Sequence, residues 1–293
     1  MHAPISISAI ASVSALGDSP KEVWESYLSK KPLFVKKKIG SQEVFVTEIS
    51  TKTQKSLTQL KASNPSYKTL DRTALLAILA SKHALQNTDL EKQSLDINIG
   101  SSRGATSLFE KYHTDFLQTG KVSPFTSPTT TLGNISSWVS QELGTKGLQI
   151  DQSVTCSTAM HALLNGIAWL QADMAQGFLV GGSEAALTPF TIAQMQALKI
   201  YSQKSDDFPC RALDFNKTKN TMVLGEGASM ACLEKGIITN ALAVIKGYGY
   251  ATEILKHNIS ISSDAQCFQR SMKMALGHIN PNEVDAIVMH APG

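Results

Sequence analysis

The 293-residue sequence has few charged residues (17%), few aromatic residues (6%) and only four cysteines. The cysteines form no CxxC pair and match no zinc-binding spacing, so neither a disulfide scaffold nor a structural metal site is expected. No apolar run is long enough to span a membrane, and Ser6–Gly17 lacks the Lys/Arg-rich start of a secretion signal. The 42% hydrophobic content is too high for a disordered chain. We therefore predict a globular, cytoplasmic protein that binds no metal and no membrane.

Nucleotide-binding motifs are also missing. The sequence contains no phosphate-loop GK[ST], and Gly247-Tyr248-Gly249 lacks the third glycine of a dinucleotide fingerprint. Gly181–Ala185 resembles a serine nucleophile elbow but ends in alanine, and we predict a tight turn there. No cofactor is therefore expected.

Positive charge is concentrated in one segment of a chain whose net charge is only +3. Nine lysines and two glutamates lie between Lys30 and Lys68, which leaves this segment at +7 and the rest of the chain at −4. Two interpretations stay open: a solvated lysine-rich face, or a docking surface for an acidic partner protein. Because the segment contains no arginine and few aromatic residues, we expect no nucleic-acid partner.

Predicted strands and helices alternate along the chain, which indicates an α/β architecture with a largely parallel sheet. The predicted strands are Ile5–Ser14, Leu95–Gly100, Leu148–Thr155 and Gly177–Gly182, and the predicted helices are Pro20–Leu28, Asp71–Gln86, Ile135–Leu143 and Ser157–Gln171. Thr126–Gly133 is predicted to be a loop, and Met222–Leu233 a hairpin or bulged turn.

One pattern occurs twice. A helix ending at Gln86 is followed by a short link and the strand Leu95–Gly100, and a helix ending near Leu276 is followed by a link and the apolar run Val284–Met289. This repetition predicts a duplicated fold whose second copy begins near Ala241. We therefore expect residues 1–240 to form one half and residues 241–293 to form the start of a second.

The strongest candidate for chemistry is Cys156, which lies where a predicted strand runs directly into a predicted helix. The free amide groups and the dipole at a helix N-terminus favour the nucleophilic thiolate form of a cysteine. The residues that follow, Ser157, Thr158 and Ala159, are small and leave room for a substrate. The alternative is a buried, unreactive cysteine.

Two histidines could assist Cys156. His161 lies five residues further on, which turns it about 140° away on a helix, so we expect it to pack or hydrogen-bond locally. His290 ends a predicted strand and opens a turn, and α/β proteins bind ligands at the carboxyl ends of strands. His290 is therefore the second candidate site residue, against the alternative of a structural or solvated histidine. The other cysteines, Cys210, Cys232 and Cys267, lack such a context and are predicted to be structural.

Several segments, in order and at fitting distances, resemble the β-ketoacyl-acyl carrier protein synthases of the thiolase superfamily. The most specific is Thr155-Cys156-Ser157-Thr158-Ala159, which is similar to the nucleophile turn of the family. The others are Ile5–Gly17, Gly100–Gly104, Gly133-Asn134, Leu143–Gly147, Gly181–Glu184, Arg211–Phe215 and Met222–Ala228.

The resemblance implies a five-layered α-β-α-β-α fold of two related halves, and a dimer. It also implies a decarboxylating Claisen condensation, with Cys156 holding an acyl group and its amide binding the oxyanion. His290 aligns with the first of two family histidines, which stabilise a malonyl thioester as it loses CO2. An acyl carrier protein would be the partner, and the segment from Lys30 to Lys68 would be the surface that binds it.

The sequence departs from the family pattern at two positions. The turn after His290 is Ala291-Pro292-Gly293 in place of Gly-Thr-Gly-Thr, which suggests a divergent subgroup of a polyketide or pigment pathway, and Met222 replaces an aromatic residue. The second histidine, the lysine and the Gly-rich loop of the family have no counterpart before Gly293, so we expect the C-terminal part of the family fold to be absent from this chain.

Two other functions remain as alternatives. One is a non-catalytic subunit of the chain-length-factor type that acts in a heterodimer, although Cys156 argues against it because such subunits lose the nucleophile. The other is a thiolase or another acyl-CoA acyltransferase.

Overall fold

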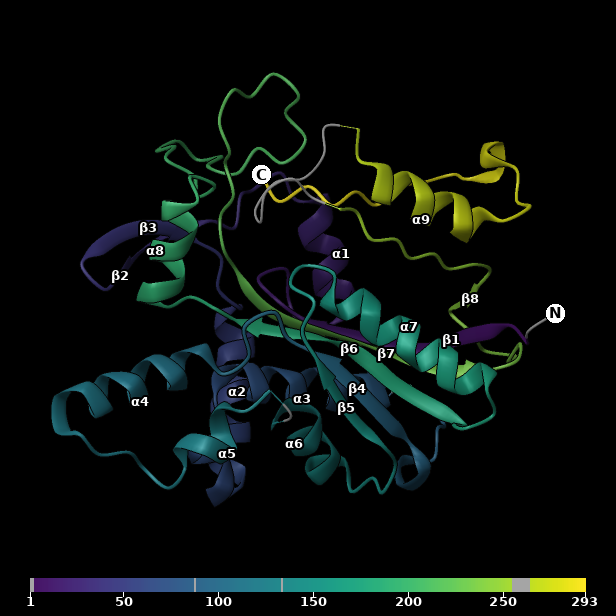
Figure 1. Cartoon of the computed structure of the whole chain (residues 1–293), viewed down its shortest axis with the longest axis horizontal. Coiled ribbons are helices and arrows are strands. Elements are labelled where there is room, and N and C mark those ends of the chain that lie inside the picture. The colour runs from purple at the N-terminus through teal and green to yellow at the C-terminus, as the bar shows by residue number, and fades with distance from the viewer. Residues whose placement is uncertain (1–2, 87, 133, 255–263) are drawn as a thin grey trace.

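A six-stranded mixed sheet runs through the middle of the molecule, with helices on both of its faces (Figure 1). The computed structural model describes residues 3–86, 88–132, 134–254 and 264–293. The strands lie in the order β5-β4-β6-β7-β1-β8. Their bounds are Gln149–Gln152 (β5), Asp96–Gly100 (β4), Gly177–Ala185 (β6), Glu226–Lys235 (β7), Ile5–Val13 (β1) and Ala243–Ile245 (β8).

The sheet is only partly parallel, so the prediction of a largely parallel sheet is wrong. Strand β4 pairs in parallel with β5 and with β6. The pairings β6–β7, β7–β1 and β1–β8 are all antiparallel. In the parallel part, formed by β5, β4 and β6, a helix follows each strand. The antiparallel part is formed by strands from distant segments of the chain.

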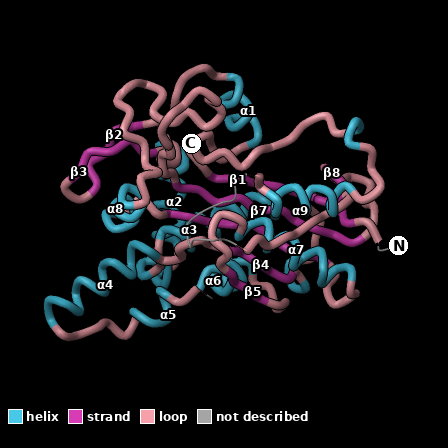
Figure 2. Tube along the Cα trace, turned by 45° about the horizontal axis from the view of Figure 1, so that its top comes forward, coloured by secondary structure: helices cyan, strands magenta, loops and turns pink. Residues whose placement is uncertain are grey.

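The helices surround the sheet and extend beyond it. Their bounds are Pro20–Leu28 (α1), Thr51–Ser63 (α2), Arg72–Leu85 (α3), Thr106–Thr119 (α4), Thr126–Thr130 (α5), Asn134–Leu143 (α6), Thr158–Gln171 (α7), Pro189–Ala197 (α8) and Gln266–Leu276 (α9). A two-stranded hairpin, β2 (Val35–Ile39) with β3 (Gln42–Val46), lies apart from the main sheet (Figure 2). No helix among the described residues is long and apolar enough to cross a membrane.

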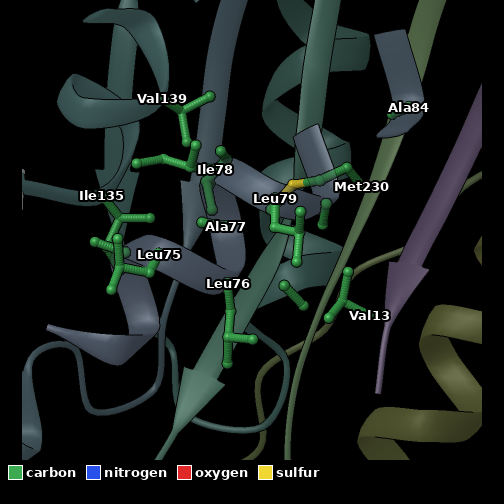
Figure 3. Packing of buried hydrophobic residues seen from close by; sticks show 14 of the residues in the cluster. Val13, Leu75, Leu76, Ala77, Ile78, Leu79, Ala84, Ile135, Val139 and Met230 are labelled. Atoms are coloured by element: carbon green, nitrogen blue, oxygen red, sulfur yellow. The ribbon is translucent and has the colours of Figure 1, made fainter. Parts of the chain in front are cut away.

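Helix α3 is the centre of the larger hydrophobic core, and 11 of its 14 residues are buried. Its apolar side chains pack with those of α6 and of the sheet, as Figure 3 shows for Leu75, Ile78, Val139 and Met230. Burying one such side chain stabilises a protein by about 1.5–3 kcal/mol. The sheet is therefore fixed mainly by α3 on this face.

The opposite face of the sheet packs against α7. Along β6, Leu179 belongs to the α3 core, whereas Phe178 and Val180 belong to a second core that includes Ile167 and Leu170 of α7. This alternation is what a strand buried on both faces requires. The helix–sheet–helix arrangement confirms the predicted α/β class, and the described residues form one such set of layers.

Most predicted elements are confirmed, and two of the helices begin with a side-chain cap. The Ser19 side chain accepts a hydrogen bond from the Glu22 amide at the start of α1. The Asp71 side chain accepts one from the Thr73 amide at the start of α3 (2.8 Å). These side chains satisfy amide groups that a helix leaves free in its first turn.

Four local predictions are wrong. The segment Thr126–Gly133 contains the short helix α5, although Gly133 itself lies outside the described residues. Met222–Leu233 contains no hairpin, because β7 starts at Glu226 and continues to Lys235 as one strand. Gly181–Ala185 is the end of β6 and not a turn. Val284–Met289 forms no strand in the described structure, and Val288 is 99% exposed.

The segment predicted to begin a second copy contains strand β8, which pairs with β1 in the main sheet, and helix α9. The glycines of Gly247-Tyr248-Gly249 let the chain lie against α9, since a Cβ on Gly247 would collide with the Ala275 carbonyl oxygen. These glycines therefore serve close packing. The boundary between residues 240 and 241 stays a prediction.

Ser136 at the start of α6 joins that helix to two strands. Its hydroxyl donates to the Ile150 carbonyl (2.7 Å) and accepts from the Ile99 amide (3.0 Å). Its own amide donates to Asp151 Oδ1 (3.1 Å). Burial raises the pKa of Asp151 from 3.8 to about 6, against the lowering effect of the hydrogen bonds from Ser136.

We expect the substitution D151N to change the pH dependence of stability. Because the folded pKa lies above the unfolded one, the parent loses free energy of unfolding as pH rises from about 4 to about 6. The asparagine can still accept the Ser136 hydrogen bond but does not ionise. Relative to that of the parent, the free energy of unfolding of D151N should therefore rise by on the order of 2 kcal/mol between about pH 4 and about pH 6.

Urea denaturation at several pH values measures this difference. The variant D89N removes a carboxylate from an exposed position and is the control for charge. A difference between D151N and the parent that stays constant from about pH 4 to pH 7 would contradict the prediction.

Candidate active site

A hollow of about 500 Å³ opens where β4 and β6 end, and Cys156 lines it. Ser101 and Ser102 contribute from the end of β4, Glu184 from the end of β6, and Ser14 and Ser229 from the region of β1 and β7. The carboxyl ends of parallel strands are where open α/β sheets bind ligands. The predicted nucleophile therefore lies in a place that a substrate can reach.

The turn that carries Cys156 is held by Thr158, the first residue of α7. The Thr158 hydroxyl accepts from the Val154 amide (2.9 Å) and donates to the Thr155 carbonyl (2.5 Å). Thr155 adopts φ +50°, a conformation that a β-branched residue rarely takes. Such backbone strain is common where a side chain is held for function. Cys156 is a free, exposed thiol.

Small residues bring the first turn of α7 close to the sheet. A Cβ on Gly100 would collide with the Thr158 methyl group, and one on Gly182 would lie 3.0 Å from the Ala159 Cβ. Larger residues at Gly100 or Gly182 would push α7 away from the ends of β4 and β6. The glycines in these two strands therefore determine where Cys156 lies.

The two histidines lie outside the hollow. His161 Nδ1 is 3.0 Å from the Ser157 carbonyl oxygen, which is the local contact expected of it. His290 is exposed in the C-terminal segment and is not among the residues that line the hollow. Two residues further on, the Pro292 carbonyl accepts a hydrogen bond from the Cys210 thiol (3.7 Å). The structure thus brings Cys156, but not His290, to this hollow.

The other cysteines do not share the environment of Cys156. Cys232 is fully buried in β7, and burial together with the nearby Glu234 raises the pKa of its thiol to about 12. Cys210 and Cys267 are half-buried. Within the described ranges, no three His, Cys, Asp or Glu side chains are grouped so that they could hold a metal ion.

Glu184 is a residue of the hollow that the sequence analysis missed. Its Oε2 accepts from the Ser102 amide (2.8 Å) and the Ser101 hydroxyl (3.3 Å). Burial raises the pKa of this carboxyl, and the hydrogen bonds and the charge of Arg103 partly oppose that rise. Glu184 was missed because Gly181–Ala185 was interpreted as a turn. Continuing the strand pattern past Gly182 would have placed Glu184 beside the end of β4.

A larger hollow, of about 900 Å³, lies among residues 199–221 and has a different character. It is lined by Lys199, Lys204, Arg211, Lys217 and Lys219, with Asp214 as the acidic side chain. It contains no cysteine or histidine. Although this hollow is larger, it offers no cysteine as a nucleophile and no histidine as a base. We therefore assign covalent chemistry to the hollow that contains Cys156.

The lysine-rich segment is divided between free and paired charges. Lys37 forms an ion pair with Glu48, and Lys52 binds Asp18 (3.1 Å) and Glu22 (2.6 Å). The hydrogen bond from Lys52 lowers the pKa of Glu22 to about 2. Part of the excess positive charge is thus neutralised within the molecule, and β2 presents two of the remaining seven lysines, Lys36 and Lys38, on an exposed strand.

Comparison with known proteins identifies a family. The model of the β-ketoacyl synthase N-terminal domain matches residues 2–236. A 3-oxoacyl-[acyl-carrier-protein] synthase 2 of Coxiella burnetii is 26% identical over 298 residues, covering 97% of this chain and 72% of the relative. The enzyme of the same name from Vibrio cholerae is 24% identical over 282 residues, covering 92% of this chain and 68% of the relative.

Solved structures show the same fold. A type II polyketide synthase acyl carrier protein in complex with its ketosynthase has a TM-score of 0.82 at 17% identity, covering 100% of this chain and 74% of that one. The ishigamide ketosynthase/chain length factor has a TM-score of 0.83 at 16% identity, covering 97% of this chain and 72% of that one. With the thiolase-like fold and the family match over most of its length, the chain belongs to the β-ketoacyl synthase family.

Proposed function

We propose that the chain is an acyltransferase that performs the condensation step of fatty acid or polyketide synthesis, with Cys156 as the acyl acceptor. The observation that carries the proposal is the exposed Cys156 thiol beside the N-terminus of α7, in a hollow at the ends of β4 and β6. The helix N-terminus favours negative charge, both on the thiolate and on an oxyanion that forms beside it.

The first step would be transfer of the acyl group. The Cys156 sulfur attacks the thioester carbonyl carbon, and a new S–C bond forms as the carrier S–C bond breaks. The proton of the Cys156 thiol ends on the carrier thiol. A thiolate suits this step because it is a good nucleophile and, in the next step, a good leaving group.

The second step would join two carbon chains. A malonyl thioester loses CO2, and the electron pair of the broken C–C bond forms a new C–C bond to the acyl carbon while Cys156 leaves as thiolate. We propose that His290 stabilises the malonyl carbonyl as charge develops on it. Since His290 lies outside the hollow, this role requires the C-terminal segment to approach Cys156.

Acyl and malonyl carriers would be the partners. The relatives reported above are named as acyl-carrier-protein synthases, and one solved neighbour is an acyl carrier protein in complex with its ketosynthase. We propose the segment from Lys30 to Lys68 as the surface that attracts an acidic carrier protein. The proposal keeps a cytoplasmic location, which agrees with four free cysteines.

A dimer is part of the proposal. Helix α4 has no buried residue, extends from the body of the molecule and exposes Phe109, Phe116 and Leu117 (Figure 1). A second protomer could cover this apolar surface. Two solved neighbours pair a ketosynthase with a chain length factor. A partner of that type is therefore one form of the proposed dimer, and a non-catalytic role of this chain in a heterodimer is the alternative.

We also propose residues 1–240 and 241–293 as two halves, which fits the end of the family match at residue 236.

Mass spectrometry after incubation with an acyl carrier thioester, or with the covalent inhibitor cerulenin, tests the role of Cys156. We expect an adduct on Cys156 that is absent from the variant C156S. The variant C210S, which removes a half-buried thiol, is the matched control and should be labelled as the parent is. Absence of an adduct, or an adduct that survives C156S, would contradict the proposed nucleophile.

The variant H290A separates the two steps. It should keep acylation of Cys156 and lose CO2 release from a malonyl carrier, because His290 is proposed to act only in the second step. CO2 release at the rate of the parent would remove His290 from the mechanism.

Charge reversal of Lys36, Lys37 and Lys38 tests the carrier surface. Surface plasmon resonance should show affinity for a holo acyl carrier protein lowered by about tenfold at low salt, with a smaller difference at high salt. The triple variant K92E/K111E/K121E makes the same charge change at other exposed positions and should bind more tightly than the first. Equal affinities of the two variants would contradict the docking role and would support the interpretation of the segment as a solvated lysine-rich face.

A further inference from the structure

Glu184 is enclosed in the candidate site and is only partly satisfied. Its Oε2 accepts two hydrogen bonds, from the Ser102 amide and the Ser101 hydroxyl, whereas Oε1 is buried with no hydrogen-bond partner among the described residues. An unpaired buried polar atom costs about 1–3 kcal/mol, and more when it is charged. A buried carboxyl that lowers the stability of the fold in this way requires an explanation in terms of what it does for the site.

The contacts of Glu184 continue to the turn that carries Cys156. The Ser102 carbonyl accepts a hydrogen bond from the Ser153 hydroxyl (3.1 Å), and Ser153 directly precedes the backbone turn that begins at Val154. Ser101 in turn accepts from the Gly104 amide (2.9 Å), which closes the turn after β4. One carboxyl at the end of β6 thus fixes the turn after β4, and that turn contacts the segment after β5.

We propose that Glu184 is a positioning residue for Cys156, which acts by holding the Ser102 backbone through its amide so that the Ser102 carbonyl lies where Ser153 can bind it. This proposal deepens the proposed function, because it assigns a support to the nucleophile named there. Ser153 and Cys156 are both exposed, and the Ser153 hydroxyl is anchored by its hydrogen bond to the Ser102 carbonyl. Without Glu184 the turn after β4 loses two hydrogen bonds, and the cysteine turn loses its fixed neighbour.

The rate at which iodoacetamide alkylates Cys156 in the folded, full-length chain measures the effect. We expect E184A to lower the second-order rate constant by about tenfold, which corresponds to one lost hydrogen bond of about 1.4 kcal/mol. The variant E184Q should keep a rate within about twofold of the parent, because its amide oxygen can accept from the Ser102 amide.

The variant D96A is the matched control. Asp96 is also a buried carboxyl of the sheet, and its Oδ1 accepts from the Leu148 amide (2.5 Å) at the opposite end of β4. Its loss should lower stability without changing the alkylation rate. An equal fall in D96A, or an unchanged rate in E184A, overturns the positioning role.

If E184A does not fold, the variant S153A tests the same link between the turn after β4 and the cysteine turn. The exposed Ser153 can be replaced without disturbing the core, and breaking its bond to Ser102 should lower the rate severalfold. An unchanged rate in S153A overturns the proposed link. Since iodoacetamide reports on the thiol alone, normal alkylation with no acyl transfer would count against the proposed function and not against Glu184.

Discussion

The burial of α3 on almost all sides is the constraint on which the rest of the structure depends. A helix without a polar face must be covered by the sheet on one side and by other helices on the other. Arg72 at its start forms a two-bond ion pair with Glu226 (2.5 and 2.6 Å), which joins α3 to β7. The Thr73 carbonyl accepts from the Ser183 hydroxyl (2.7 Å), next to Glu184. The edge of the candidate site is thus attached directly to the rigid core.

Local sequence signals determined most elements but not their pairing. The caps Ser19 and Asp71 and the apolar spacing of α3 act within a few residues, so they could be recognised from the sequence. The antiparallel contacts of β6, β7 and β1 depend on segments far apart in the chain, which no local pattern encodes. The run Val284–Met289 has the composition of a strand, but strand formation requires a neighbour, and none pairs with it in the described structure.

The candidate site shows the same division. Cys156 could be predicted because its strand–turn–helix context is continuous in sequence. Glu184 was missed because Gly181 and Gly182 were interpreted as turn residues, whereas they are strand residues that allow close approach: a Cβ on Gly181 would collide with the Ser229 carbonyl oxygen. His290 likewise lies outside the hollow, because its place depends on the path of the C-terminal segment, which a motif does not contain.

The position of β1 has a consequence for how the chain acquires its structure during synthesis. This strand lies between β7 and β8, and its Ser6 contacts Gly236, 230 residues later. At about 5–20 residues per second, a ribosome needs roughly 10–50 s to make the intervening chain. The parallel unit β5-β4-β6 can assemble in that time, while β1, which is made before these three strands, waits unpaired. We expect nascent chains to need protection of this strand from aggregation until β7 is made.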